Sequence, residues 1–481
     1  MSKKSQAALE FLTTYGWAFI VILTMIGAVS YFGGLNPSGF VQGSCVVGSP
    51  FACDSNQFVV GSKGFVVQVV NGQQATIVSN LQYFYDEDWH QCGQFRASTV
   101  QPSSELILPC IFAPGHESSS RSNTNFKFTS TSPSDSDGTF SRTIQGTLRS
   151  TRIEQTHPSS IEMLGFVSAS PELAGATAIA YHDGYAYVAN WNGASFAIVD
   201  VSDPNNVEIV GYEQNSSLMA GMHSVKVDDS GILYTAGSNS RRISSYDVSD
   251  PSNPVLLDSF YRVDIRPLDM QIVGTTMYVT GYVNHFILIL DISDPSNIQE
   301  LGYLSDSASM NGATDIRVVG DHALIAARGV SNPSTSSGRL AVLDVSDPSD
   351  IIVEDVYLNH SIFNWTWSLD VAGDYAYVVA ARSGSLVTFD ISDLPNIEMV
   401  HVDQGNLVHP RHVMVGGNKL YVADLNDASI KIYDVSNPAQ PSYQGDYHRP
   451  GFINSARYID INYPYLYLAS MSNTVSVFDI S

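Results

Sequence analysis

The chain has 481 residues, which at about 150 residues per domain predicts roughly three domains. Its 47 acidic residues against 23 lysines and arginines give a net charge of −24, and because nucleic-acid phosphates bind basic surfaces, this charge excludes a nucleic-acid partner. Hydrophobic residues make up 44% and charged residues 15%, a composition that buries a core and excludes a charge-driven disordered chain.

The N-terminal segment contains a long apolar run. Residues 11–32 carry no charge, and a helix of this length, at about 1.5 Å per residue, reaches roughly 33 Å and spans a bilayer. Lys3 and Lys4 precede the run, so the positive-inside rule places the rest of the chain outside the cell. A cleaved secretory signal is the alternative, but its apolar core has about 7–15 residues. We therefore expect a transmembrane helix.

The segment KKSQAALEF, which begins this helix, resembles the class III signal peptide of archaeal type IV pilin-like proteins. The resemblance implies that a prepilin-type peptidase removes a leader, residues 1–5, by cutting between Ser5 and Gln6. It implies that residues 6–35 form the apolar pilin helix and that Glu10 pairs with the amine of a neighbouring subunit during assembly. Serine stands where the family usually has glycine before the cut. A plain membrane anchor is the alternative.

The next segment, residues 36–156, predicts a small β domain. Short runs of β-branched and aromatic residues alternate with turn residues, which is typical of a sandwich or partial barrel. All four cysteines of the chain lie here, and outside the cell they favour two disulfides, Cys45–Cys53 and Cys92–Cys110, with the other pairings left open. Zinc is the competing interpretation, but no Cys-x-x-Cys motif occurs. An apolar stem followed by a small β head is similar to a pilin.

A repeat organises the remainder of the chain. Seven copies of an apolar strand ending in Asp-Val/Ile-Ser recur at spacings of 44 to 53 residues, and further strands precede and follow each copy. A period of this size indicates the blades of a β-propeller. Asp and Ser at a turn cap backbone N–H groups, whereas a calcium site would need more than one carboxylate per turn. The repeated aspartates are Asp200, Asp247, Asp291, Asp344, Asp390, Asp434 and Asp479.

The ends of the repeat region predict how the ring closes. The seventh copy stops at Ser481 without a fourth strand, while HPSSIEMLGFV at 157–167 echoes DPSNIQELGYL at 294–304. We expect residues 160–168 to complete the seventh blade, so that no sheet edges are exposed. The propeller would then span 157–481. Its repeats resemble the LVIVD-repeat family of surface and secreted β-propellers, from which no catalytic residue is carried over.

Alignment of the predicted innermost strands gives the candidate ligand site. Asp269, Asp315 and His412 fall at one equivalent position, where they would hold a cation or a sugar in the central channel. The alternative is a polar ring satisfied by water and by its own members. Three tryptophans, Trp191, Trp365 and Trp367, either form a sugar-stacking platform or pack between blades. The segment HPRH at 409–412 is the one close histidine pair.

No catalytic motif, phosphate loop or metal-binding motif occurs, so we predict neither an enzyme nor a cofactor or metal. Three asparagines match the N-glycosylation sequon: Asn215, Asn359 and Asn364.

These observations combine into one expected architecture and function. The fold class is mainly β, with an N-terminal transmembrane or filament α-helix, a small disulfide-stapled β-sandwich and a seven-bladed β-propeller. The chain would be a subunit of an archaeal type IV pilus-like filament, or a pilin-like surface protein, that displays its propeller for adhesion. Expected partners are the membrane, copies of itself or other pilins, the peptidase, and a surface glycan or protein. The alternative is a membrane-tethered extracellular enzyme or sensor with a sugar or metabolite in the channel.

Overall fold

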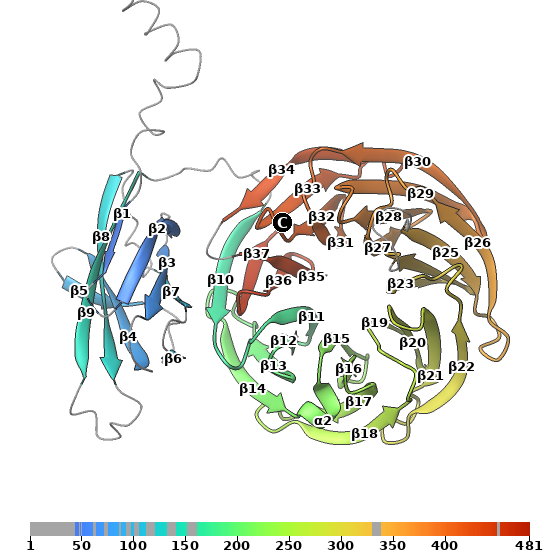
Figure 1. Cartoon of the computed structure of the whole chain (residues 1–481), viewed down its shortest axis with the longest axis horizontal. Helices are drawn as coiled ribbons and strands as arrows, with labels where there is room; N and C mark the ends of the chain where they lie inside the picture. The colour runs from blue at the N-terminus through green and yellow to red at the C-terminus, as the bar shows by residue number, and fades with distance from the viewer. Residues whose placement is uncertain are drawn as a thin grey trace, which may run out of the picture.

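The computed structural model describes the chain from residue 44 onward, with gaps. The described residues are 44–47, 49, 51–60, 64–71, 76–85, 88–92, 98–100, 105–111, 121–131, 141–151, 161–329, 338–449 and 453–481. They form a small two-sheet domain and a ring of seven four-stranded sheets (Figure 1). The ring is a seven-bladed β-propeller.

The expected fold class included an N-terminal transmembrane or filament α-helix, and the described residues contradict this element of it. Within the described ranges the single helix is α2, Ser216–Met219, which at about 1.5 Å per residue is roughly 6 Å long. None of the described helices is long and apolar enough to cross a membrane. The described part of the chain is therefore nearly all β. The calls on the leader, the cut, Glu10 and the apolar run fall on residues 1–35, outside the described residues.

The small domain is a sandwich of two sheets. One sheet has the order β1 (Ser44–Val47), β9 (Arg142–Thr151), β8 (Arg121–Thr131), β4 (Thr76–Tyr85) and β5 (Asp88–Gln91), with β6 (Ser98–Val100) also paired to β4. The other has the order β2 (Phe51–Val60), β3 (Gly64–Asn71) and β7 (Glu105–Ile111). Both contribute to one core, in which the rings of Phe51 and Phe128 meet at 5.1 Å. Cys92 and Cys110 form a disulfide, and the side chains of Cys45 and Cys53 lie outside those described.

Each blade is a four-stranded antiparallel sheet whose first strand lies innermost. Blade 1 contains β11 (Ala176–His182), β12 (Tyr185–Asn190), β13 (Ser195–Asp200) and β14 (Glu208–Gln214). Blade 2 contains β15 (Met222–Val227), β16 (Ile232–Gly237), β17 (Arg242–Asp247) and β18 (Val255–Tyr261). Blade 3 contains β19 (Asp269–Val273), β20 (Thr276–Gly281), β21 (Phe286–Asp291) and β22 (Gln299–Ser305). Blade 4 contains β23 (Ala313–Val319), β24 (His322–Ala327), β25 (Arg339–Asp344) and β26 (Ile352–Leu358).

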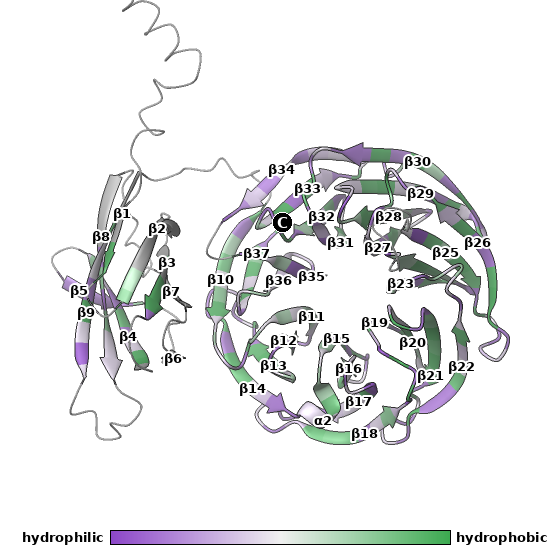
Figure 2. Ribbon diagram, viewed as in Figure 1, coloured by the Kyte–Doolittle hydropathy of each residue, from purple (hydrophilic) through white to green (hydrophobic). Residues whose placement is uncertain are grey.

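The remaining three blades follow the same order. Blade 5 contains β27 (Thr366–Ala372), β28 (Tyr375–Ala380), β29 (Ser385–Asp393) and β30 (Asn396–Gln404). Blade 6 contains β31 (Pro410–Gly416), β32 (Lys419–Asp424), β33 (Ser429–Asp434) and β34 (Ser442–His448). Blade 7 contains β35 (Ala456–Asn462), β36 (Tyr465–Ser470), β37 (Thr474–Asp479) and, as its outer strand, β10 (Glu162–Ser168). Hydrophobic residues concentrate inside the blades, and outer strands such as β22 and β34 are more hydrophilic (Figure 2).

The repeated Asp-x-Ser segment forms the turn that ends the third strand of a blade. In all seven copies the aspartate Oδ1 accepts a hydrogen bond from the backbone N–H two residues later, at 2.8 or 2.9 Å. Such Asx turns are a short-range property of the sequence. The hydrogen bonds also lower the pKa of Asp247 and Asp434, as expected for a carboxylate that accepts N–H groups.

The ring closes by antiparallel pairing of β10 with β37, which joins Met163 to Phe478 and Val167 to Val475. Some outer strands of the ring share a glycine at the same position, close to a proline carbonyl of the following blade. Because β10 also has this glycine, it is equivalent to those outer strands. A Cβ on Gly302 would lie 1.6 Å from the carbonyl oxygen of Pro348 in the following blade. A Cβ on Gly165 of β10 would likewise lie 2.4 Å from the carbonyl oxygen of Pro204. Blade 7 therefore contacts blade 1 as blade 3 contacts blade 4.

Candidate functional site

The innermost strand carries one additional residue near its start in every blade except blade 3. In six blades the pairing of the first two strands shifts by one residue there, for example between Pro410 and His412. A β-bulge leaves the extra residue unpaired and re-aims its side chain. The six extra residues and Leu268, which precedes β19, form what we call the mouth ring: Thr177, His223, Leu268, Thr314, Trp367, Arg411 and Arg457.

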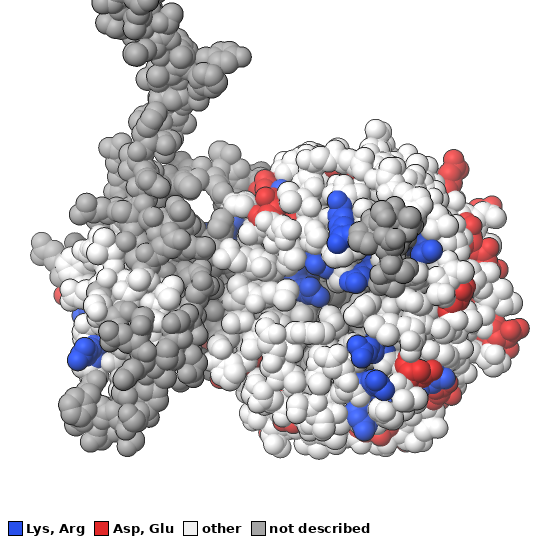
Figure 3. All heavy atoms as spheres, in the orientation of Figure 1, with Lys and Arg blue, Asp and Glu red and all other residues white. Residues whose placement is uncertain are grey.

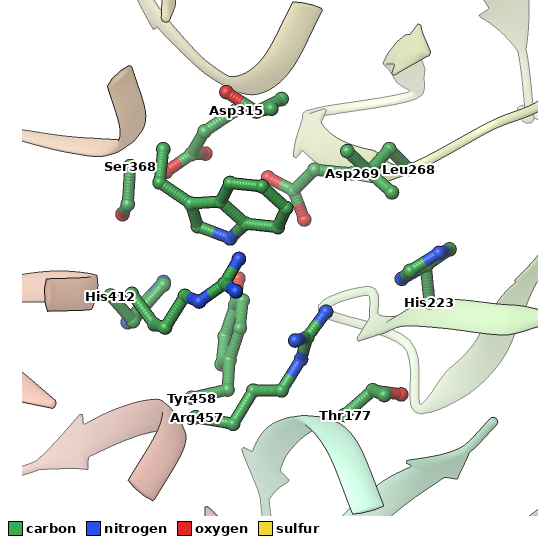
Figure 4. Close-up of a pocket in the computed structure, with 12 residues that line it drawn as sticks. Thr177, His223, Leu268, Asp269, Asp315, Ser368, His412, Arg457 and Tyr458 are labelled. Carbon is green, nitrogen blue, oxygen red and sulfur yellow. The ribbon is translucent and has the colours of Figure 1, made fainter. Parts of the chain in front are cut away.

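The mouth ring surrounds a cavity in the central channel (Figure 4). The cavity has a volume of about 30 Å³. Because a single water needs about 10–15 Å³ by this measure, the cavity holds roughly two waters. It accepts a small chemical group rather than a whole sugar ring. The next residues of the same strands complete its lining: Asp269, Asp315, Ser368, His412 and Tyr458.

Beyond this lining, the channel interior holds a network of paired charges. Arg317 donates to Asp315 at 2.8 Å and to Asp370 at 3.0 Å. Lys226 donates to the hydroxyl of Tyr458 at 2.9 Å. Buried charges are tolerated when they are paired and hydrogen-bonded in this way. Each cationic side chain of the interior thus already has a partner in the protein.

The pKa values of the two predicted carboxylates, Asp269 and Asp315, shift in opposite directions. Burial raises the pKa of Asp269 to about 7, against the attraction of Lys226, and the nearby Asp315 raises it further. Burial would also raise the pKa of Asp315, but the charge of Arg317 and a hydrogen bond with Asp269 hold it well below its usual value. The two carboxylates therefore share one proton near neutral pH, which is typical of close carboxyl pairs.

Polar residues of the innermost strands, the predicted Asp315 among them, also tie neighbouring blades together. Asp315 Oδ2 accepts the backbone N–H of Leu369 in the next blade at 3.0 Å. Asp370 Oδ2 accepts that of Val415 at 2.8 Å, and Gln271 Oε1 accepts that of Val318 at 2.6 Å. The structure thus brings the sequence-predicted positions together, and it gives the carboxylate of Asp315 a structural role between blades.

His412 is a neutral donor in the cavity lining. Its ring stacks on Tyr458 with centroids 3.6 Å apart, and its Nδ1 accepts the backbone N–H of Ile459 at 3.5 Å. Burial lowers the pKa of His412 well below its usual value, although Asp315 opposes the shift. In the neutral tautomer that this contact favours, Nε2 carries the proton, and Nε2 has no hydrogen-bond partner. The side chain therefore offers one unused N–H.

Four arginines and two tryptophans interleave at the mouth; we call them the arginine–tryptophan cluster: Arg328, Arg382, Arg411, Arg457, Trp365 and Trp367. The guanidinium carbon of Arg411 lies 4.0 Å from the Trp367 ring, and that of Arg382 lies 3.6 Å from the Trp365 ring. Arg328 lies between the two rings, at 5.1 Å from Trp365 and 5.6 Å from Trp367. Among the described residues, no carboxylate forms a salt bridge with any of these arginines.

The cluster leaves positive charge and donors unused. Nε and Nη1 of Arg411 and Nε of Arg328 are buried and have no hydrogen-bond partner. Burial, followed by the charges of Arg457 and Arg328, lowers the pKa of Arg411 to about 9. Burial lowers the pKa of Arg457 to about 10. Figure 3 shows lysines and arginines gathered around the centre of the propeller's visible face, whereas acidic residues lie at its rim.

Trp365 has a strained backbone. Its φ is +62°, and the residues at the same place in blades 1, 2 and 4 are Gly175, Gly221 and Gly312, all at positive φ. A bulky residue in this left-handed region is unfavourable by about 1–2 kcal/mol, and such strain concentrates at ligand-binding sites. The structure thus keeps a large aromatic side chain where three other blades use glycine.

The remaining predicted positions are distributed as follows. Trp191 reaches the mouth, where its ring contacts that of His223 with centroids 4.3 Å apart and planes tilted by 56°. Asn215 caps α2, and its Oδ1 accepts the hydroxyl of Ser217 at 2.6 Å. Asn359 makes the same contact with the serine two residues on, at 2.8 Å, and Asn364 is half-buried.

A second polar cluster, on blade 6, contains Asp427, Asp446 and His448. The ammonium of Lys431 donates to both aspartates, so a side-chain cation already neutralises them. We assign no metal to this cluster.

Sequence reasoning missed the mouth ring because a bulge breaks the two-residue alternation of a strand. Strict alternation that places His412 on the channel side of the strand would place its neighbour Arg411 on the other face. A signal was present in the sequence. Consecutive polar or aromatic residues, as in Arg457-Tyr458 and Trp367-Ser368, are unusual in an alternating buried strand and would have indicated the bulge.

Comparisons with known proteins support the propeller. The LVIVD repeat pattern matches residues 175–212, 246–261, 269–305, 312–358, 365–402 and 409–448. No curated protein sequence matches the chain.

Among solved structures, virginiamycin B lyase from Staphylococcus aureus is similar over 67% of this chain and 100% of its own, with 12% identity and a TM-score of 0.52. The WD40 propeller domain of Doa1 covers 67% of this chain and 98% of its own, with 11% identity and a TM-score of 0.53. A chain of the Mitotic Checkpoint Complex covers 69% and 98%, with 12% identity and a TM-score of 0.53. These likenesses concern the fold alone.

Proposed function

We propose that the protein is an extracellular binding protein whose propeller holds a surface glycan at the mouth ring, and that it acts by attachment rather than by catalysis. The observation that carries this proposal is the arginine–tryptophan cluster, three members of which, Trp367, Arg411 and Arg457, line the cavity, with unused donors on Arg411. Binding sites are concave and combine aromatic surface with a few convergent polar groups. The cavity of the mouth ring has both features.

The rigid setting of the site supports a binding role. The mouth ring projects from the innermost strands, and hydrogen bonds such as Asp315 to Leu369 fix each strand to the next blade. A site built on strands is held more accurately than one built on loops. The Cys92–Cys110 disulfide supports an extracellular location, because disulfides persist in oxidising compartments. The filament role expected from residues 1–35 is not needed for this proposal.

The enzyme alternative has one observation in its favour. Asp269 lines the cavity with a pKa raised to about 7 by burial, which suits a general acid or base. Asp269→Asn separates the two functions: binding by an attachment protein should survive this substitution, whereas turnover that depends on the carboxyl should not.

A cavity-filling variant tests the proposal. The full chain and Leu268→Trp are applied to an array of neutral and acidic glycans. Leu268 lines the cavity, so the larger ring should block it and abolish glycan binding. Leu358→Trp is the matched control, because this leucine lies on an outer strand with 51% of its surface exposed. Absence of glycan binding by the parent, or equal binding by Leu268→Trp, would contradict the proposal.

A further inference from the structure

We infer that the mouth ring is an oxyanion site, which takes a carboxylate, sulfate or phosphate group of the ligand between Arg411, Arg457 and Trp367. The inference rests on the proposed function and names the chemistry of the ligand group that enters the cavity.

Unused donors give the first argument. Arg411 keeps Nε and Nη1 without partners in a buried position, and His412 keeps Nε2. Nearly all buried polar groups in proteins are hydrogen-bonded, so each exception calls for an explanation such as an absent ligand. The planar fork of a guanidinium matches the two oxygens of an oxyanion. An oxyanion in the cavity would satisfy these donors together.

Charge gives the second argument. The chain carries a net charge of −24, yet the mouth gathers four arginines that no described carboxylate pairs. Of the deeper acidic groups, Asp315 and Asp370 already pair with Arg317, and no salt bridge among the described residues joins Asp269 to the mouth arginines. An uncompensated buried charge is unfavourable unless a counter-charge binds. The bound anion would supply the negative charge that the protein does not.

Size gives the third argument and limits the ligand. A cavity of about 30 Å³ admits one group of a few heavy atoms, so the oxyanion belongs to a larger ligand that stays outside. The faces of Trp367 and Trp365 are already stacked against Arg411 and Arg382, at 4.0 and 3.6 Å. The arginines are therefore oriented by the tryptophans, and it is the guanidinium donors that meet the ligand.

The strain at Trp365 argues against a purely structural cluster. Its φ of +62° destabilises the free protein, whereas glycine serves at the same place in three other blades. A cluster that served only stability would gain nothing from this arrangement. The strain is explained if Trp365 holds Arg328 and Arg382 at the mouth, where their positive charges favour an anion in the cavity.

Titration of the full chain with defined anions tests the inference. Isothermal titration uses sodium glucuronate, sodium sulfate and inorganic phosphate, with glucose as the neutral control and sodium chloride holding the ionic strength constant. We expect at least one oxyanion to bind and glucose not to bind, and the anion with the highest affinity identifies the group. Arg411→Gln with Arg457→Gln should weaken binding by about ten-fold or more, as for the loss of charged hydrogen bonds. Arg142→Gln, in the small domain, is the charge-matched control.

A second measurement distinguishes a ligand-binding role from a structural one. Arg411→Met should leave the free protein at least as stable as the parent, while it removes the increase in melting temperature that the oxyanion produces. A structural role would instead lower the melting temperature and leave the anion effect intact.

The outcomes separate the two proposals. Glycans that bind on the array without any effect of oxyanions would overturn the oxyanion inference alone. Equal anion binding by the double variant would also overturn it. Failure of both the array and the titration would overturn the proposed function as well.

Discussion

The channel interior and the mouth lie one to three residues apart along the same strands, yet their arginines differ in how their charge is compensated. In the interior, Arg317 bridges Asp315 and Asp370, with nitrogen–oxygen distances of 2.8 and 3.0 Å. At the mouth, Arg411 is comparably enclosed and stacks on Trp367, but no described carboxylate reaches it. The interior arginine is therefore neutralised by carboxylates of the protein and stabilises the fold. For the mouth arginine, we expect a bound ligand to supply the negative charge.

The bulge creates this division. Residues in regular register, such as Asp315, point toward the next blade and accept its backbone N–H groups. The extra residues line the cavity, and they differ among themselves: Thr177 and Thr314 donate to backbone carbonyls of the next blade at 3.0 and 3.2 Å. Nε and Nη1 of Arg411 have no such partner. A local change of register thus brings a side chain with unused donors beside positions that join the blades. Substitutions at four positions test this division, and they are given from the largest expected effect to the smallest.

Arg317→Met should destabilise the propeller most. Removal of the guanidinium leaves Asp315 and Asp370 buried without a cation, which costs about 3–5 kcal/mol in comparable cases. Urea denaturation followed by circular dichroism measures the free energy of unfolding. Arg142→Met in the small domain is the control and should change it by less than about 0.5 kcal/mol. If the free energy of unfolding falls by less than about 1 kcal/mol, the ion pairs of the interior do not stabilise the fold.

Asp269→Asn should change the pH dependence of stability. Burial raises the pKa of Asp269 from 3.8 to about 7, so between these values the folded chain keeps a proton that the unfolded chain releases. The stability that this proton contributes is complete below about pH 4 and is lost as the pH rises through about 7. Asparagine resembles the protonated carboxyl and removes this slope. Relative to the parent, the variant should gain about 2 kcal/mol between roughly pH 5 and pH 8. Parallel curves for the two proteins would contradict the shared proton.

Arg411→Met should act in the opposite direction to Arg317→Met. It removes a charge that the free protein leaves uncompensated, so the unfolding free energy should rise by about 1 kcal/mol in chloride buffer. The comparison with Arg317→Met under identical conditions is the measurement of interest, since both replace a buried arginine by the same apolar side chain. If both variants lose stability equally, the mouth and the interior do not differ.

Trp365→Gly and Trp365→Ala should differ by the backbone strain alone. At an ordinary helix or strand position, glycine is less stable than alanine by about 0.5–1 kcal/mol. At φ +62° the order should reverse, with the glycine variant more stable by about 1 kcal/mol. Thermal melts of the two variants give this difference. The usual order would mean that the backbone relaxes once the indole is removed.

The sequence predicts the propeller well because its signals are local and repeated. Each Asp-x-Ser turn depends on one carboxylate and the amide two residues later, as in Asp344 and Ser346. Seven copies reveal the blade count, and the likeness of residues 157–167 to 294–304 indicates the strand that pairs with β37. Gly165 and Gly302 share the same close approach to a proline carbonyl, so this likeness reflects one physical environment.

The site is predicted only in part, because its composition depends on register and on distant neighbours. The position of Asp269 and Asp315 near the channel follows from strand alternation. That Arg411 faces the cavity depends on a bulge, which alternation hides. That Arg317 neutralises Asp370, 53 residues away, depends on the packing of adjacent blades, which no local pattern reports.

The closure of the ring has a mechanical consequence. The polypeptide enters the propeller through β10, whose six residue pairs with β37 run from Glu162–Asp479 to Ser168–Thr474. Tension between the small domain and a ligand held at the mouth ring therefore passes through this single strand. Under load, β10 should detach first and open blade 7, while the other six blades keep all four of their strands. In a pulling experiment, the strength of that one pairing would set the force at which the propeller yields.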